Sequence, residues 1–173
     1  MYRISGYRAL TILLCCVYSV AAPAALINMS ASLSGDQEVP PTGSAGSGSA
    51  SILFDDVSNQ LNWNITFSGL TGAATGAHFH GPAPAGSNAS VQVNIGSISG
   101  LSSPMIGATA ISEAQEADLL AGLWYINIHT GQFPGGEIRG QVLTQVVPLP
   151  AAAWLLASGV VGLFGAGRTL RRR

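Results

Sequence analysis

Three histidines have the residue type and spacing that could form a functional site. His78 and His80 lie two positions apart in a short extended run, and His129 ends a second run. Side chains alternate between the two faces of a β-strand, so His78 and His80 point to the same face. If the two strands share a sheet, the three imidazoles converge. Imidazole is a ligand that Zn²⁺ and Cu²⁺ prefer, and the sequence therefore offers a metal site.

A row of polar side chains accompanies the histidines. Residues 124–129 alternate, with Trp124, Ile126 and Ile128 on one face and Tyr125, Asn127 and His129 on the other. Residues 137–143 also alternate, with Ile138, Gly140 and Val142 facing inward and Glu137, Arg139 and Gln141 facing outward. We therefore expect a polar patch of Tyr125, Asn127, Glu137 and Arg139. Glu137 or a water molecule would complete the coordination of a metal ion held by the histidines.

A polar network without metal explains the same three histidines. Arg139 lies two residues from Glu137 on the same strand face, where it would pair with a carboxylate. The histidines would then hydrogen-bond to backbone groups around the turns at residues 81–82 and 135–136. Surface histidines usually need no ligand, so the sequence favours this network over a metal site.

The other candidate residue groups, acidic pairs and serines, do not have the pattern of a functional site. Asp36 with Glu38, and Asp55 with Asp56, lack the ligand spacing of a calcium loop, and we expect them to be acidic turn residues. The serines form no Gly-x-Ser-x-Gly nucleophile motif with a partnered histidine. We therefore assign no catalytic residue and do not expect an enzyme.

Short strands must position these residues. The clearest strand is Gln60 to Ser68, whose alternation would bury Leu61, Trp63, Ile65 and Phe67. The other expected strands cover residues 27–33, a stretch that ends at 54, and residues 76–80, 91–95, 105–111, 124–129 and 137–143. A capping-box pattern at residues 112–115 predicts one helix, from Glu113 to Ala121. This pattern predicts an all-β fold, an antiparallel immunoglobulin-like or Greek-key β-sandwich with one short helix.

The charge of the central segment argues against nucleic acid as a partner. The chain has seven basic residues and no lysine, and residues 25–145 keep only Arg139 against all eight acids. The formal charge of this segment is therefore −7, and its surface would repel phosphate backbones. Its length corresponds to one domain with its own core.

The N-terminal 24 residues read as a secretory signal peptide. Arg3 and Arg8 precede a run of 12 apolar residues from Ala9 to Val20, and small residues follow. A retained membrane anchor is the alternative, but 12 residues span only ~18 Å as a helix. Both cysteines, Cys15 and Cys16, lie inside this run. The mature domain would therefore be held by its core without disulfides.

The C-terminal residues 146–173 have the pattern of a second targeting signal. Val147, Pro148, Leu149, Pro150 and Ala151 precede an uncharged stretch at 151–167, and arginines follow at 168 and 171–173. This stretch is just long enough for a transmembrane helix, and the arginines would stay on the cytoplasmic side.

The whole C-terminal segment resembles the PEP-CTERM sorting signal in its VPLPA form. The resemblance implies a bacterial host, recognition by an exosortase-type transpeptidase, cleavage near the proline-rich motif, and delivery to the cell surface or extracellular space. Alternatively, the glycines at 159, 162 and 165 mark a face on which two membrane helices pair.

Four ordered motifs resemble the CHRD domain. They are Leu33 to Pro41 (LSGDQEVPP), Ala77 to Pro82 (AHFHGP), Tyr125 to Thr130 (YINIHT) and Pro134 to Gln141 (PGGEIRGQ). The resemblance covers Ala31 to Val142 and implies an immunoglobulin-like β-sandwich in an extracellular setting, with no established activity.

The sequence thus predicts an exported binding or structural module with domain boundaries at 25–145. Its partner would be an extracellular protein, a polysaccharide or a metal. The alternative is a Zn or Cu metalloenzyme that uses His78, His80 and His129, because the histidine pair is similar to the copper site of Cu,Zn superoxide dismutase. The mature chain lacks the disulfide cysteines of that family.

Overall fold

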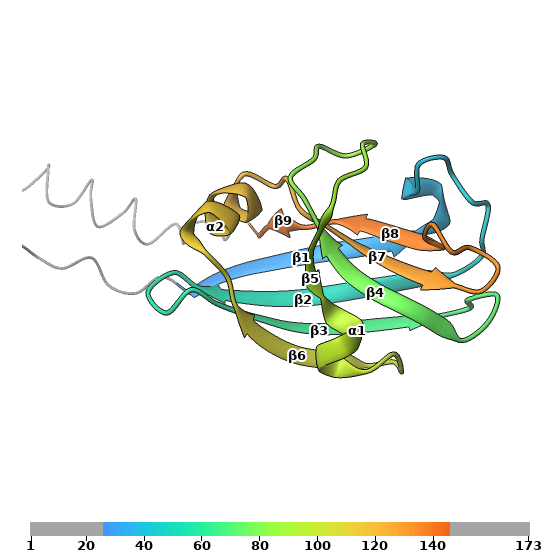
Figure 1. Ribbon diagram of the computed structural model, residues 1–173, viewed down its shortest axis with the longest axis horizontal. Helices are drawn as coiled ribbons and strands as arrows, with labels where there is room; N and C mark the ends of the chain where they lie inside the picture. Colours follow the sequence, from blue (N-terminus) through green and yellow to red (C-terminus); the bar gives the residue numbers. More distant parts are fainter. Residues whose placement is uncertain (1–25, 146–173) are drawn as a thin grey trace, which may run out of the picture.

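Nine β-strands form one antiparallel sheet in the computed structural model, which describes residues 26–145 (Figure 1). The strands are β1 (Leu26–Ser34), β2 (Ser47–Asp55), β3 (Gln60–Ser68), β4 (Ala74–His80), β5 (Val91–Asn94), β6 (Met105–Ala110), β7 (Tyr125–Thr130), β8 (Ile138–Gln141) and β9 (Leu143–Thr144). The helical elements are the 3-10 helix η1 (Gly35–Gln37) and the α-helices α1 (Ile95–Ser99) and α2 (Glu113–Leu120). The predicted antiparallel β class is confirmed.

The sheet curls so that its two halves face each other across the core. The strand order is β5-β4-β7-β8-β1-β2-β3-β6, with β9 beside β1. β1 meets β8 at one residue pair, Ser34 opposite Arg139, and meets β9 at two, so the two halves join at a narrow seam. A Cβ at Gly140 would lie 2.5 Å from the Ser32 carbonyl oxygen, so this close approach requires glycine. The result is one continuous sheet where we expected two separate layers.

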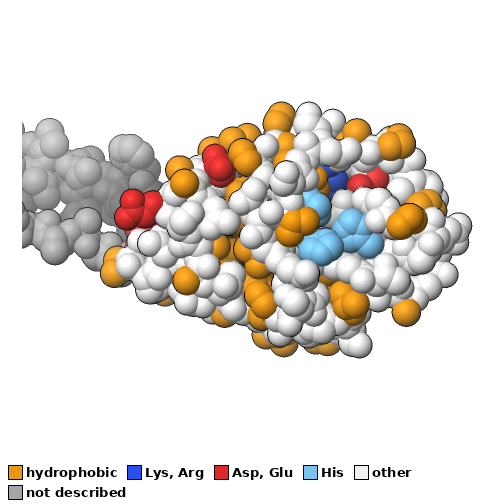
Figure 2. Space-filling model, viewed as in Figure 1, with side chains coloured by type: hydrophobic (Ala, Val, Ile, Leu, Met, Phe, Trp, Pro, Cys, Tyr) orange, Lys and Arg blue, Asp and Glu red, His pale blue; other side chains and the backbone are white. Residues whose placement is uncertain are grey.

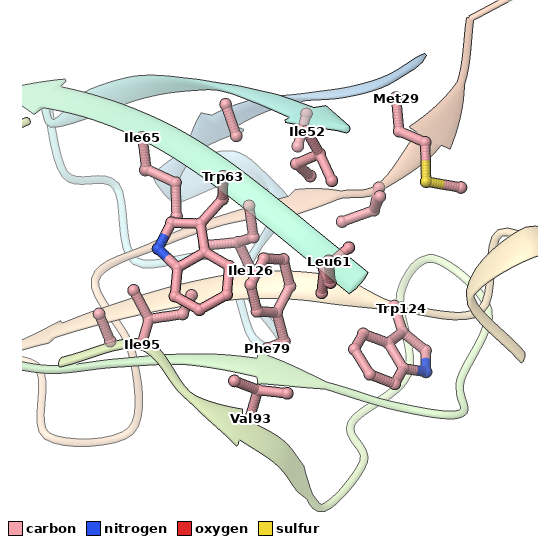
Figure 3. Packing of buried hydrophobic residues seen from close by; sticks show 14 of the residues in the cluster. Met29, Ile52, Leu61, Trp63, Ile65, Phe79, Val93, Ile95, Trp124 and Ile126 are labelled. Atoms are coloured by element: carbon pink, nitrogen blue, oxygen red, sulfur yellow. The ribbon is translucent and has the colours of Figure 1, made fainter. Parts of the chain in front are cut away.

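The core lies inside the curl and is made of the predicted apolar faces. Leu61, Trp63 and Ile65 on β3 are buried, as their alternation predicts, whereas Phe67 is only partly buried. The Phe79 ring from β4 lies 5.5 Å from the Trp63 ring and 6.0 Å from the Trp124 ring, measured between centroids (Figure 3). These rings connect the two halves of the sheet, and their burial stabilises the curl.

The helices differ in part from the sequence expectation. The Ser112 capping box is present and α2 begins at Glu113, but this helix ends at Leu120, one residue early. The expected strand at 91–95 ends at Asn94, because the Asn94 side chain accepts a hydrogen bond from the Ser97 amide and caps α1. The alternation at 91–95 did not indicate this helix.

Both predicted targeting signals lie outside the residues that the structure describes. These are the signal peptide at 1–24 and the sorting segment at 146–173, including the expected transmembrane helix at 151–167. Within residues 26–145, no helix is long and apolar enough to cross a membrane.

Substitution of Ile65 by alanine is expected to destabilise the domain by about 2 to 5 kcal/mol, because this fully buried side chain leaves a cavity between the sheet halves. The adjacent Asn64 is exposed on the other face of β3 and provides the matched control. Asn64→Ala should change the free energy of unfolding by no more than about 0.5 kcal/mol. Equal effects in urea denaturation would contradict the assignment of the two faces.

Candidate metal centre

The structure brings the three histidines together on the outer face of the sheet. β4 and β7 are neighbours, and their register places His78 opposite Asn127, His80 opposite Tyr125, and Gly76 opposite His129. One ring nitrogen from each histidine can be chosen so that all three lie within 4.8 Å of one another. Figure 2 shows the histidine side chains gathered in one patch at the surface.

Backbone carbonyls fix the tautomers of two of the rings. His129 Nδ1 lies 3.0 Å from the Pro134 carbonyl oxygen, and His80 Nδ1 lies 2.9 Å from the Ala89 carbonyl oxygen. A carbonyl oxygen only accepts, so each Nδ1 carries the proton and each Nε2 keeps its lone pair. The Nε2 of His80 is buried and has no hydrogen-bond partner. Metal-binding histidines usually make such a second hydrogen bond to a carbonyl or carboxylate.

The spacing of the rings is compatible with a metal ion. His78 Nδ1 lies 3.1 Å from His129 Nε2, and two nitrogens bound to one tetrahedral zinc lie about 3.3 Å apart. Gly76 makes room for this contact, because a Cβ at this position would lie 3.2 Å from His78 Cε1 and 3.4 Å from His129 Cδ2. The three residues therefore fit Zn²⁺ or Cu²⁺.

Burial favours the neutral form of the three histidines. Burial lowers the pKa of all three imidazoles below its ordinary value, and the neighbouring rings lower the pKa of His78 further. Hydrogen bonds to Ala89 and Pro134 oppose this effect at His80 and His129 without reversing it. Metal ions bind neutral imidazole, so this direction of the pKa shifts favours metal binding.

Tyr125 and Arg139 support His80 from one side. The Tyr125 ring stacks on the His80 ring with a centroid distance of 5.0 Å and an interplanar angle of 7°. The Cζ atom of Arg139 lies 3.4 Å from the Tyr125 ring centroid. The Ala89 amide donates to the Tyr125 hydroxyl, and Ala89 also accepts from His80. Ring stacking and one backbone position thus hold the orientation of His80.

Glu137 does not serve as a metal ligand in this arrangement. Its carboxylate accepts hydrogen bonds from the Ser44 and Thr130 hydroxyls and from both the hydroxyl and the amide of Thr71. Burial alone would raise the pKa of Glu137, but these hydrogen bonds outweigh it, and the pKa lies below its ordinary value. The side chain is an ionised, fully buried part of the fold.

Arg139 does not form the expected pair with Glu137. Its guanidinium donates to the Asn88 side-chain oxygen at 3.0 Å and to the Ser87 carbonyl at 2.6 Å. Both Arg139 and Glu137 were expected to face outward, and both are buried. They do lie on the face opposite the apolar core, but loops cover that face.

Glu38 is not the exposed acidic turn residue that the sequence predicts. This side chain is 6 % exposed, and it accepts a hydrogen bond from the Asn127 side-chain amide at 3.4 Å. Burial raises the pKa of Glu38 to about 7, although Arg139, the Val39 amide and Asn127 oppose the change. Its position next to the paired prolines at 40–41 was the available signal, because a rigid turn can hold a side chain inward.

Glu38 is expected to make stability depend on pH. Its folded-state pKa of about 7 lies above the ordinary 4.5, so the protonated form favours the fold. This contribution is complete below about pH 4.5 and is lost as the pH rises through about 7, a change on the order of 2 to 3 kcal/mol. Glu38→Gln should remove this part of the pH dependence in urea denaturation. Asp36→Asn, at an exposed acid two residues away, should retain it, and equal pH profiles in both variants would contradict the assignment.

Comparison with known proteins identifies the domain. The family model described as the CHRD domain matches residues 29–142. Comparisons with curated proteins and with solved structures gave no match. The matched region begins in β1, ends just after β8 and contains all three histidines. The chain therefore belongs to the CHRD domain family.

Proposed function

We propose that this CHRD domain is an exported binding module that holds one transition-metal ion, Zn²⁺ or Cu²⁺, through His78, His80 and His129. The observation that carries this proposal is the convergence of the three imidazoles, in which carbonyls set the tautomers of His80 and His129 so that each Nε2 has a lone pair that can bind a metal ion. The donor set, the spacing and the direction of the pKa shifts of the rings all suit such an ion.

The polar network that the sequence favoured accounts for fewer of these contacts. It explains the hydrogen bonds to Ala89 and Pro134 and the one between His78 Nδ1 and His129 Nε2, but it leaves the buried Nε2 of His80 without a partner. An unsatisfied buried acceptor costs roughly 1 to 3 kcal/mol, and a bound metal would remove this cost. The unpartnered Nε2 of His80 therefore favours the metal site over the metal-free polar network.

The two terminal segments suggest where the protein is located. We infer that residues 1–24 direct export and that residues 146–173 are a PEP-CTERM-type signal processed by an exosortase-type transpeptidase. The protein would then lie at a bacterial surface or in the extracellular matrix, where an extracellular protein or a polysaccharide is also a potential partner. The sequence pattern Val147 to Ala151 supports this placement.

Metal binding is tested by titrating the purified full chain, made without a histidine tag, with Zn²⁺ and Cu²⁺ in a calorimeter. One ion per chain is expected. His78→Ala, His80→Ala and His129→Ala should each weaken binding at least tenfold, because each removes one of three ligands. The matched control is Glu113→Gln, an exposed acid on α2, which should bind as the original chain does.

Binding that stays unchanged in all three histidine variants would contradict the proposed site. Thermal denaturation gives a second readout, because an ion that binds only the folded state raises the melting temperature. That rise should be absent in His80→Ala.

Sorting is tested by mass spectrometry of the protein extracted from the surface of bacteria that contain an exosortase. Peptides from residues 154–173 should be absent, since cleavage near the proline-rich motif removes them. A variant with Pro148→Ala and Pro150→Ala should retain these peptides. Their presence in the original surface protein would contradict processing of this segment.

A further inference from the structure

Within residues 26–145, the histidine cluster has three ligand atoms for a metal ion and no fourth. Among residues 26–145, the only grouping able to hold a metal consists of His78, His80 and His129. The oxygens of Glu137 are engaged by hydroxyls and an amide, and Glu38 is buried against Asn127. Four-coordinate zinc or copper would therefore take its remaining ligand from solvent.

The cluster is open on the side away from the core. Each of the three histidines is partly exposed, whereas Phe79 and Ile128, which alternate with them along β4 and β7, are fully buried. The histidine patch is visible at the surface in Figure 2. The imidazoles are therefore accessible from the outer face of the sheet, although the Nε2 of His80 itself is buried.

The charge around the cluster favours an anion as the solvent-derived ligand. Three neutral imidazoles would leave the full double charge of the ion uncompensated. Arg139 lies behind the Tyr125 ring that stacks on His80, and the residue is 1 % exposed, so salt screens this positive charge little. The occupied site would be a locally positive point on a domain whose formal charge is −7.

We infer that an ion held by His78, His80 and His129 keeps one exchangeable coordination position that faces solvent and binds a small anion such as a carboxylate. This inference rests on the proposed metal binding and adds the class of ligand that the metal site takes. Three protein ligands with an open fourth position is the arrangement in which zinc exchanges water for another ligand.

Azide is the probe, because its binding to Cu²⁺ produces a charge-transfer absorption band. The full chain, loaded with one equivalent of Cu²⁺, should develop a band that saturates at one azide per copper. Acetate should compete for the same position and raise the azide concentration needed for half-saturation at least threefold. Glu113→Gln should give the same titration, whereas His80→Gln should lose the band or need at least tenfold more azide.

The outcomes separate this inference from the proposed function. Stoichiometric copper binding with a spectrum that azide leaves unchanged would overturn the open position and leave the metal site standing. Failure of the chain to bind copper or zinc would remove both. An identical azide titration in His80→Gln would show that copper sits elsewhere, and this result would also overturn both.

Discussion

The antiparallel pairing of β4 with β7 is the constraint on which the candidate site depends. These two strands contribute Phe79 and Ile128 to the core and His78, His80 and His129 to the opposite face. A slip of one residue would exchange the two faces, so the burial of the apolar residues fixes the register. The position of the imidazoles is thus set by hydrophobic packing on the other side of the same strands.

The outer face of this half of the sheet is a layer of hydrogen-bonded polar groups. The segment from Ser87 to Ala89 organises much of this layer, because its backbone and side chains receive hydrogen bonds from Arg139 and His80 and donate one to Tyr125. The Glu137 carboxylate likewise accepts hydrogen bonds from three hydroxyls and an amide, which come from two loops and from Thr130 at the end of β7. Buried polar groups of this kind stabilise a structure only when they are satisfied together. The loops that cover the face are therefore part of the fold.

The sequence predicted the features that depend on local periodicity. Alternation located β3 and the two faces of β7, and a capping box located α2, because each signal depends on residues close together in the chain. The spacing of the histidines predicted their common face, and the pairing of β4 with β7 brought them together.

The environment of the polar residues could not be predicted in the same way. Alternation shows that Arg139 and Glu137 lie on the non-core face, but it does not show that loops distant in sequence cover that face. The burial of Glu38 and the contact of Arg139 with Asn88 depend on the same coverage. Periodicity also did not show that the strands join into a single sheet, because this depends on the few residue pairs that join β1 to β8 and β9.

The seam at Ser34 and Arg139 has a consequence for the dynamics of the domain. β1 and β2 are paired along nine residues, whereas β1 meets β8 at one pair and β9 at two. A junction with so few backbone bonds opens more readily than a long ladder. Fluctuations that separate the two halves of the sheet would begin at this seam. Because Arg139 itself lies in the seam, they would disturb the stacked rings of Tyr125 and His80 before they affected β2 and β3.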